Sequence, residues 1–315
     1  MWLVSDLLSD VRRRGMLPAT QSLGFTDADL IAHANNEMAS HMVPLVLSVN
    51  EEFYVQTVNI PLVAGKAAYR MPNRNAGAKL RDVTYIIGGQ LQPLFRIEPE
   101  QLSSWVSGAS GSPQGFYLEA GTLNLVPAPS AGGTLRMRYF VRPGAFTATA
   151  TDFGTVASVT TNTVDSMGLG VFSGTYTGSL TAGSLIFDVI AYRPPFEYLA
   201  LNAEAFTFSA PNINLVGDGA TSTMSPNIAV GDYITKPDLS PVLQLPVELH
   251  SLLSQRVVCA VMEALNYGDR LARAREAAAE MEAAALKLIT PRIDSAPKKM
   301  RGLLNQNPGY WPRWR

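Results

Sequence analysis

The feature that most constrains this chain is a long run of helical periodicity that begins after Pro246 and ends before Pro291. Apolar residues recur there at steps of three and four, the spacing that places them on one face of an α-helix. The stripe is built of leucine and valine up to Leu265 and mostly of alanine beyond it. The alanine-rich half follows heptad-like steps at Leu271, Ala274, Ala278, Met281, Ala285 and Leu288. Because small side chains let helices approach closely, we expect this seam to form contacts between copies of the chain.

The length of this helix depends on Gly268. An unbroken helix from Val247 to Ile289 would span roughly 65 Å at about 1.5 Å per residue. A break at Gly268 would divide it, because glycine in a helix interior costs about 1 kcal/mol relative to alanine. The sequence leaves both arrangements open.

Residues 291–315 form a basic and aromatic segment. Residues 286–315 hold seven basic residues and one acidic residue, and Pro297, Pro308 and Pro312 favour an extended backbone. Trp, Tyr and Arg dominate the energetics of protein interfaces, although aromatic and arginine side chains also stack on nucleic-acid bases. We expect this segment to bind a groove on a protein partner, with nucleic-acid binding or a solvated segment as the alternatives. The side chains expected to bind are Lys298, Lys299, Arg301, Tyr310, Trp311, Arg313, Trp314 and Arg315.

Helical patterns also mark the beginning of the chain. Residues 5–14 carry apolar side chains on one face of a short helix. A longer helix is predicted after Thr26, which is placed to form a capping box with Asp29. Pro44 interrupts the apolar pattern of that helix, so the sequence predicts a kink or a break there.

Between these helical ends the period changes to two. From Tyr54 to Val141, hydrophobic and polar residues alternate as in half-exposed antiparallel strands. Two hairpins are predicted, one around Gly88-Gly89 and one over Ala120-Gly121.

Residues 144–243 form a second β region of different composition. They are rich in Ser, Thr, Gly and Asn and predict short strands of a small sandwich or barrel. They hold eight acidic residues and only two basic ones, Arg193 and Lys236. This acidic region contrasts with the cationic segment at 291–315.

Together these patterns predict an α+β protein. Its N- and C-terminal helices form a helical core beside an antiparallel β region and an inserted all-β domain. The expected parts are residues 1–143 with the N-terminal helices and the first β region, 144–243 with the inserted acidic β domain, 244–290 with the C-terminal helix that packs against the N-terminal helices, and 291–315 with the extended segment.

The sequence contains none of the usual catalytic motifs. It has no G-x-x-x-x-G-K-[ST] phosphate loop, no G-x-S-x-G nucleophile turn and no H-E-x-x-H zinc motif. His33, His41 and His250 lack the spacing of metal ligands, and Cys259 is the single cysteine. No signal-peptide pattern and no run of about 18 apolar residues is present. We therefore expect a structural protein that is not an enzyme, uses no cofactor or metal, and is neither exported by a signal peptide nor inserted in a membrane.

Several short motifs carry a resemblance to one family. They are Tyr69-Arg70-Met71-Pro72-Asn73-Arg74, Leu80-Arg81-Asp82-Val83, Gly111-Ser112-Pro113-Gln114-Gly115-Phe116-Tyr117-Leu118, Leu125-Val126-Pro127-Ala128-Pro129, Leu135-Arg136-Met137-Arg138-Tyr139-Phe140, Leu245-Pro246-Val247-Glu248-Leu249-His250 and Thr290-Pro291-Arg292-Ile293-Asp294. In this order, after a helical N-terminus, the chain resembles the head-to-tail adaptor (connector) proteins of tailed bacteriophages. The likeness runs over nearly the whole chain.

The resemblance implies a virion structural protein of the neck, assembled in the host cytoplasm. Such a protein forms a homo-oligomeric ring, usually of twelve subunits, beneath the portal protein. Double-stranded DNA passes through the ring without sequence-specific contact, including during genome ejection, and tail nozzle or tail tube proteins bind below. In such families a C-terminal segment commonly reaches onto the portal, which would make residues 291–315 a portal-docking segment. The acidic β domain would then form a collar outside the ring.

Two other functions stay open from the sequence. The Ser-, Thr- and Asn-rich loops of residues 144–243 also fit a tail or neck protein that binds a host surface or a glycan through its β domain. A pair of carboxylates, such as Glu51 with Glu52 or Glu98 with Glu100, also fits an enzyme that acts on cell wall.

Overall fold

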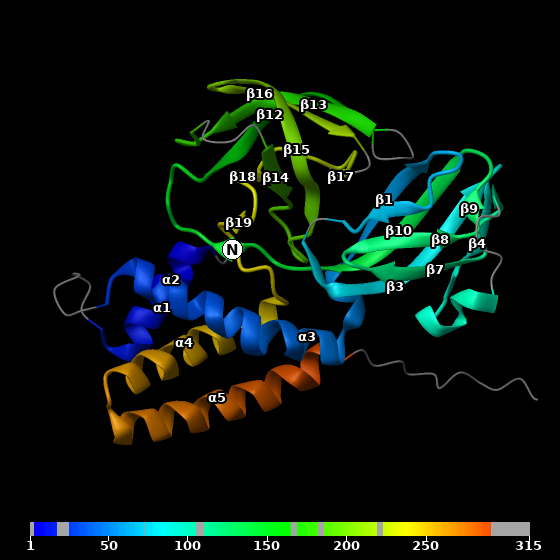
Figure 1. Cartoon of the computed structure of the whole chain (residues 1–315). Coiled ribbons are helices and arrows are strands. Elements are labelled where there is room, and N and C mark those ends of the chain that lie inside the picture. The colour runs from blue at the N-terminus through cyan, green and yellow to red at the C-terminus, as the bar shows by residue number, and fades with distance from the viewer. Residues whose placement is uncertain are drawn as a thin grey trace, which may run out of the picture.

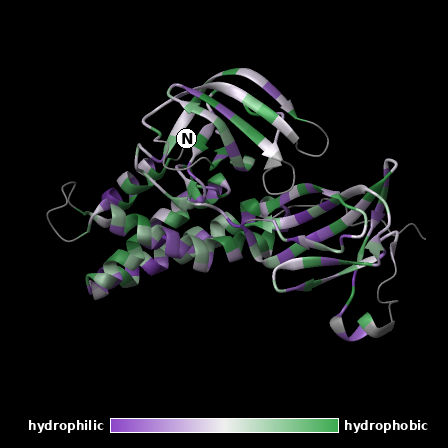
Figure 2. Cartoon of the chain, turned by 45° about the horizontal axis from the view of Figure 1, so that its top comes forward, coloured by the Kyte–Doolittle hydropathy of each residue, from purple (hydrophilic) through white to green (hydrophobic). Residues whose placement is uncertain are grey.

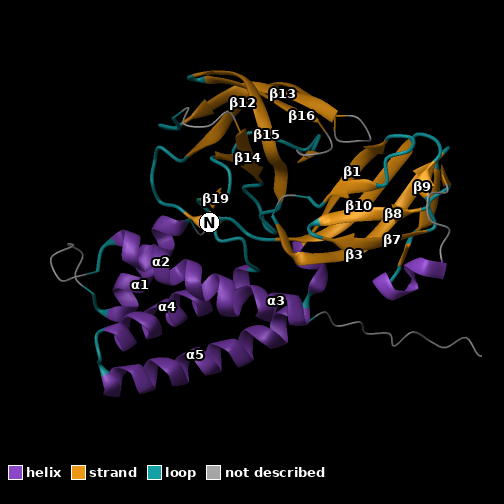
Figure 3. Ribbon diagram, in the orientation of Figure 1, coloured by secondary structure: helices purple, strands orange, loops and turns teal. Residues whose placement is uncertain are grey.

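The structure is a computed structural model that describes residues 3–17, 25–72, 74–104, 110–164, 169–181, 186–218 and 223–290. A layer of helices lies along one side of the molecule, a β-barrel lies over it, and a second β region lies beside the barrel near the end of the helix labelled α3 (Figure 1 and Figure 3). The fold is therefore mixed α+β, as the sequence predicts.

The helices near the N-terminus begin where the sequence places them. They are α1 (Val4–Gly15), α2 (Asp27–Glu37), the π-helical turn η1 (Met38–Met42), α3 (Val43–Val49) and the 3-10 turn η2 (Glu51–Tyr54). The capping box of α2 is confirmed: Asp29 N–H donates to Thr26 Oγ1 at 3.2 Å, and Thr26 N–H donates to Asp29 Oδ2 at 2.9 Å. These bonds satisfy backbone donors that a helix start otherwise leaves free.

The interruption expected at Pro44 takes the form of a π-helical turn. Val43 N–H donates to Met38 O, five residues back, instead of to a carbonyl four residues back. In an ordinary α-helix the ring of Pro44 would meet the carbonyl of Ser40, and proline offers no N–H to that carbonyl. The wider turn accommodates the ring, so the chain passes Pro44 without leaving the helix.

The C-terminal helical stretch is a hairpin and not a single rod. It consists of the 3-10 turn η4 (Val247–Leu249), α4 (His250–Ala264) and α5 (Gly268–Ile289). Asn266 adopts a left-handed conformation with φ of 56° between the two helices, and Gly268 is the first residue of α5. α4 contacts α1, α2 and α5, so it lies at the centre of the helical layer.

The first β region contains two four-stranded sheets. Its strands are β1 (Val55–Leu62), β2 (Ala68–Arg70), β3 (Asn75–Ile87), β4 (Gln90–Pro93), β5 (Phe95–Arg96), β6 (Ser110–Gly111), β7 (Gly115–Glu119), β8 (Thr122–Val126), β9 (Ala128–Pro129) and β10 (Gly133–Val141). One sheet has the order β1-β10-β3-β4 and is antiparallel throughout. The other has the order β2-β8-β7-β5, and its β5–β7 pair is parallel, as is the separate β6–β9 pair.

Both predicted hairpins are confirmed. Gly88 and Gly89 have φ of 55° and 80° between β3 and β4, and Ala120 and Gly121 have φ of 46° and 78° between β7 and β8. Two consecutive residues with positive φ form the turn that matches the twist of the flanking strands. A 3-10 turn, η3 (Pro99–Ser104), follows β5.

The second β region is a closed barrel, which decides between the two predicted forms. Its strands are β12 (Phe153–Val164), β13 (Leu169–Thr177), β14 (Ile186–Ile190), β15 (Tyr198–Ser209), β16 (Asn212–Asp218), β17 (Thr223–Met224) and β18 (Tyr233–Thr235). The order β14-β18-β12-β13-β16-β15 closes through a further β14–β15 pairing, and β17 pairs with β15. At the base, β11 (Ala145–Phe146) and β19 (Leu239–Ser240) run parallel where the chain enters and leaves the barrel.

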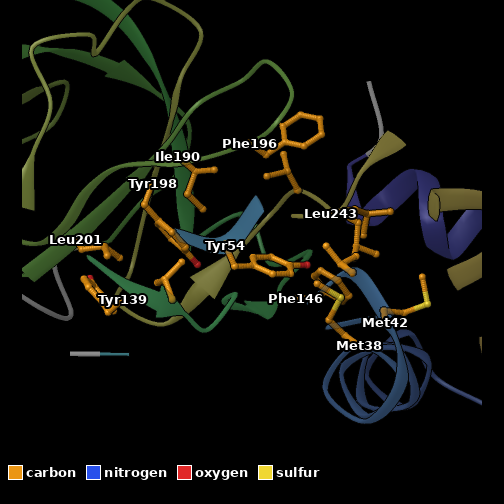
Figure 4. Packing of buried hydrophobic residues seen from close by; sticks show 14 of the residues in the cluster. Met38, Met42, Tyr54, Tyr139, Phe146, Ile190, Phe196, Tyr198, Leu201 and Leu243 are labelled. Atoms are coloured by element: carbon orange, nitrogen blue, oxygen red, sulfur yellow. The ribbon is translucent and has the colours of Figure 1, made fainter. Parts of the chain in front are cut away.

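Two hydrophobic clusters hold these elements together. Hydrophobic and hydrophilic residues alternate along the strands of both β regions (Figure 2). The barrel has an interior cluster of its own, in which Phe208 stacks on Phe187 and Tyr176. The larger cluster is shared, because Met38 and Met42 of the helical layer, Tyr139 of the first β region and Tyr198 of the barrel belong to it (Figure 4).

Candidate functional site

The alanine-rich seam of α5 is largely covered by the same chain. Ala274, Ala278 and Ala285 are buried, and Leu271 and Met281 are half-buried against the shared core. The covering contacts come from neighbouring helices: Gln255 Nε2 of α4 donates to Ala274 O at 3.1 Å. Leu288 differs from the other five seam residues, because 73% of it is exposed. A contact between copies through this seam stays a prediction.

Three charged side chains and His41 connect α2, the π-helical turn, α4 and α5. Arg256 Nε of α4 donates to Glu37 Oε2 at 2.8 Å, and its Nη1 lies 3.7 Å from Glu282 Oε2 of α5. The same Glu282 oxygen lies 3.0 Å from His41 Nε2. His41 is thus part of a polar network between helices.

The predicted portal-docking side chains lie outside the described residues. They are Lys298, Lys299, Arg301, Tyr310, Trp311, Arg313, Trp314 and Arg315. Their role stays a prediction. The described chain reaches Thr290, at the C-terminal end of α5.

An ion cluster, here called the Arg74 clasp, joins the first β region to the barrel. It consists of Arg74, Asp188, Asp238 and Tyr198. The side chains of Arg74 and Asp188 are buried in it, whereas that of Asp238 is exposed. Arg74 Nη1 donates to Asp188 Oδ2 at 2.6 Å, and Arg74 Nε donates to Asp238 Oδ1 at 2.9 Å. The guanidinium carbon lies 4.7 Å from the centre of the Tyr198 ring, within cation–π range. The clasp therefore connects a residue just before β3 with β14, β15 and the approach to β19.

Asp188 carries the electrostatic cost of this arrangement. Its side chain is fully buried, and its oxygens also accept from Asn202 N–H at 2.8 Å and Asp238 N–H at 3.1 Å. Burial raises the pKa of Asp188 to about 6, and Arg74 and the two backbone donors only partly oppose that rise.

A second polar network lies beside the clasp and centres on Gln244. Its Oε1 accepts from Tyr198 Oη at 2.7 Å and from Gly144 N–H at 3.0 Å, and its Nε2 donates to Phe196 O at 3.2 Å. Tyr54 Oη donates to Gln244 O at 2.9 Å. Burial raises the pKa values of the Tyr54 and Tyr198 hydroxyls, so both serve as neutral hydrogen-bonding groups. At Gly144 a Cβ atom would lie 2.9 Å from the backbone carbonyl carbon of Leu239, so this position requires glycine.

An open groove, here called the β1 groove, lies between the barrel and the first β region. Its volume is about 590 Å³. One wall is formed by residues 50–57 of η2 and β1, and the other by residues 195–199 and 224–227 of the barrel, with Gln244 beneath. Its lining includes Phe53 and Val55, which are half-buried, and the buried residues Phe196, Leu199 and Met224. The floor of the groove is therefore the same polar and aromatic joint that the clasp stabilises.

Sequence reasoning missed the clasp and the groove. One signal was present: Asp188 interrupts the apolar run Ile186–Ile190, and a carboxylate inside such a strand is almost never fully buried without a partner. The partner, Arg74, lies more than one hundred residues earlier, so its identity needed the fold.

The described residues include charged groups in the interior, among them Arg74 and Asp188, that join parts of the fold. The described residues contain no group of three or more His, Cys, Asp or Glu side chains that could hold a metal ion. None of the described helices is both long and apolar enough to cross a membrane. Their buried charged groups are engaged in joints between elements, as in the Arg74 clasp.

Comparison with known protein families identifies the class to which this chain belongs. A family model described as SU10 adaptor protein matches residues 3–165, which is more than half of the chain and includes α1 to β12. The chain therefore belongs to the SU10 adaptor protein family, a family of phage head-tail adaptors, and the resemblance seen in the sequence is confirmed. This family is a structural one and not an enzyme family. No curated protein matches the chain.

Replacing Arg74 with methionine should destabilise the joint strongly and in a pH-dependent way. Removing one partner of a buried ion pair costs about 3–5 kcal/mol. The pKa of Asp188 in the folded chain, about 6, lies above that of an ordinary aspartate, so Asp188 favours folding when protonated, and that contribution is lost as pH rises through about 6. Without Arg74 the pKa should rise further, and the deficit relative to the natural chain should grow between about pH 5 and pH 8.

Thermal unfolding followed across that pH range measures this deficit. Arg136→Met is the matched control, because Arg136 lies on the half-exposed face of β10 and its Nε donates to the Asn59 side chain at 3.3 Å. A deficit that is independent of pH, or equal in the two variants, would contradict the assignment of Asp188 and Arg74 as a coupled pair.

Replacing Ala278 with leucine should destabilise the helical hairpin, while the same change at Ala279 should not. Ala278 is 4% exposed between helices, so a larger side chain there overpacks the core at a cost of about 1–3 kcal/mol. Ala279 is exposed, and a surface change of this kind is usually within about 0.5 kcal/mol. Thermal melting followed by the helical circular-dichroism signal compares the two variants. Equal losses would show that the seam does not face inward.

Proposed function

We propose that this chain is a head-to-tail adaptor subunit that forms a ring beneath the portal of a tailed phage, in the neck of the virion. The ring joins the capsid to tail nozzle or tail tube proteins, and double-stranded DNA passes through its channel without sequence-specific contact. The observation that carries the proposal is the family match over residues 3–165, which covers α1 to α3, the whole first β region and β12.

Packing extends this argument to the part of the chain beyond the matched residues. α4 contacts both α1 and α2, and the ion network of Arg256 joins α2 to α4 and α5. The barrel is tied to the first β region by the Arg74 clasp. A ring built through the matched part would thus carry the hairpin and the barrel in fixed positions.

We assign residues 291–315 as the portal-docking segment, with Trp311 and Trp314 as its anchors. They follow directly after α5, and their aromatic and cationic side chains are those that dominate protein interfaces. The exposed Leu288 lies in the last turn of α5, so the end of that helix already presents an apolar side chain at the surface.

The barrel has an acidic composition, but some of its acidic residues serve to hold its fold together. Asp188 and Asp232 are buried and accept backbone hydrogen bonds, so they do not contribute to the outer field. Glu197 and Glu204 are exposed. We place the barrel on the outside of the ring, where exposed carboxylates do not face the DNA phosphates.

Deleting residues 291–315 should abolish docking to the portal without unfolding the subunit. The described packing involves residues up to 290, so the truncated chain should keep its fold and its circular-dichroism spectrum. Docking is measured by mixing the purified chain with the purified portal protein of the same phage and imaging the mixture by negative-stain electron microscopy. The full chain should give rings attached to portals.

Normal docking by the truncated chain would remove the role assigned to residues 291–315. The absence of any ring on the portal with the full chain would contradict the proposed adaptor function as a whole.

A further inference from the structure

The β1 groove has the shape of a site for an extended chain. It is open to solvent and runs along η2 and the first residues of β1, Val55–Thr57. Among the described strands, β1 stands at the end of the order β1-β10-β3-β4 and pairs with β10. An edge strand offers backbone N–H and C=O groups on its free side, which an added extended segment can pair with.

The chemistry of the lining indicates what kind of segment fits. Two charged residues line the groove, Glu52 and Glu197, and both are acidic. Glu52 pairs with Arg81 and Arg138, whereas Glu197 is exposed and makes no ion pair with any described residue. Apolar residues that are half-buried or exposed contribute to the remaining surface, among them Phe53, Val55 and Pro226. An extended segment that is both cationic and aromatic is complementary to this surface.

Residues 291–315 of the chain have that chemistry. They contain six basic residues, one acidic residue, and the aromatic residues Tyr310, Trp311 and Trp314, with prolines that favour extended backbone. At up to about 3.3 Å per residue, a segment of this length can span the groove and its approach.

The described chain also ends close to the groove. α5 contacts η4, and the antiparallel hairpin brings Ile289, which packs on the shared core, to that end of the helical layer. η4 begins at Val247, three residues after Gln244, which lines the groove. A segment tethered so near a complementary site meets it at a high effective concentration, which favours its own groove over that of another copy.

We propose that in the unassembled subunit the β1 groove binds residues 291–315 of the same chain, as an extended segment beside β1. The groove then binds the aromatic side chains of Tyr310, Trp311 and Trp314 until the portal protein competes for the segment. The holding role rests on the proposed portal docking of this segment, whereas occupancy of the groove does not.

Site-specific photo-cross-linking on the full chain, without portal, tests the occupancy. Benzoylphenylalanine replaces the exposed Asn227 on the groove wall, and as a control it replaces Phe206, which is 84% exposed on β15 and does not line the groove. Equal amounts of unlabelled and ¹⁵N-labelled chains are mixed before irradiation. Mass spectrometry should find cross-links from position 227 to peptides within 291–315, joining peptides of the same isotope, and few from position 206.

Cross-links that join labelled to unlabelled peptides would assign the groove to a neighbouring copy and overturn the proposal. The same holds if position 227 gives no cross-link to residues 291–315, or no more than position 206 gives.

Charge reversal gives a second measurement. Glu197→Lys should lower the cross-link yield by about threefold or more, as expected for the loss of one favourable charge contact and the gain of an unfavourable one, whereas Glu204→Lys on the barrel wall should leave it unchanged. Trypsin should also cleave after Lys298, Lys299 and Arg301 faster in the Glu197→Lys chain. Equal effects of the two substitutions would overturn the assignment.

Portal docking separates this proposal from the proposed function. A Glu197→Lys chain should dock on the portal at least as well as the natural chain, because its segment is freed. The truncated chain 1–290 could dock normally while the full chain still gives the cross-link from position 227. In that case the portal-docking role of residues 291–315 is wrong and their contact with the groove stands.

Discussion

Arg74 is the residue on which the arrangement of the two β regions depends. Its guanidinium lies between two carboxylates and an aromatic ring, all of them supplied by a part of the chain more than one hundred residues away. In a setting of low dielectric an ion pair of this kind contributes little net free energy compared with apolar packing, but it fixes direction, because its fork of donors accepts few geometries. The clasp thus specifies how the barrel sits more than how stably it folds.

The polar network around Gln244, beside the clasp, also fixes geometry, but it does so with neutral hydrogen-bonding groups. Gln244 engages both its amide oxygen and its amide nitrogen, and its partners come from two parts of the chain, Gly144 and residues 196–198. Buried polar networks with every member satisfied are rigid, because each displaced group would leave another without a partner. In the ring proposed above, such a joint would hold the barrel at the same tilt in every copy.

Much of the secondary structure followed from the sequence, because its signals are local. The capping box at Thr26, the paired turns at Gly88-Gly89 and Ala120-Gly121, and the alternation on β10 each depend on neighbours within a few residues. The sequence left open whether the helix breaks between α4 and α5. A break is favoured only if α5 can pack on another surface of the chain, and α4 provides that surface. The inward direction of Ala274 and Ala278 was not predictable either, because an alanine seam looks the same whether it meets its own chain or another copy. The clasp and the groove were not predicted, because their members approach each other only in the folded chain.

The parallel pair of β11 and β19 has a consequence for how such a chain can change over time. The strand that enters the barrel and the strand that leaves it lie side by side, with Ala145 opposite Leu239 and Phe146 opposite Ser240. Neighbouring strands are about 4.8 Å apart, so a short loop could close that gap if everything between them were lost or exchanged. In the sequence, the barrel is therefore a module that insertion or deletion can replace at one place, between β11 and β19. Loss of the barrel would remove the carboxylates of Asp188 and Asp238 that pair with Arg74. We therefore expect a relative without the barrel to carry a different residue at this position, or another acidic residue that pairs with the arginine.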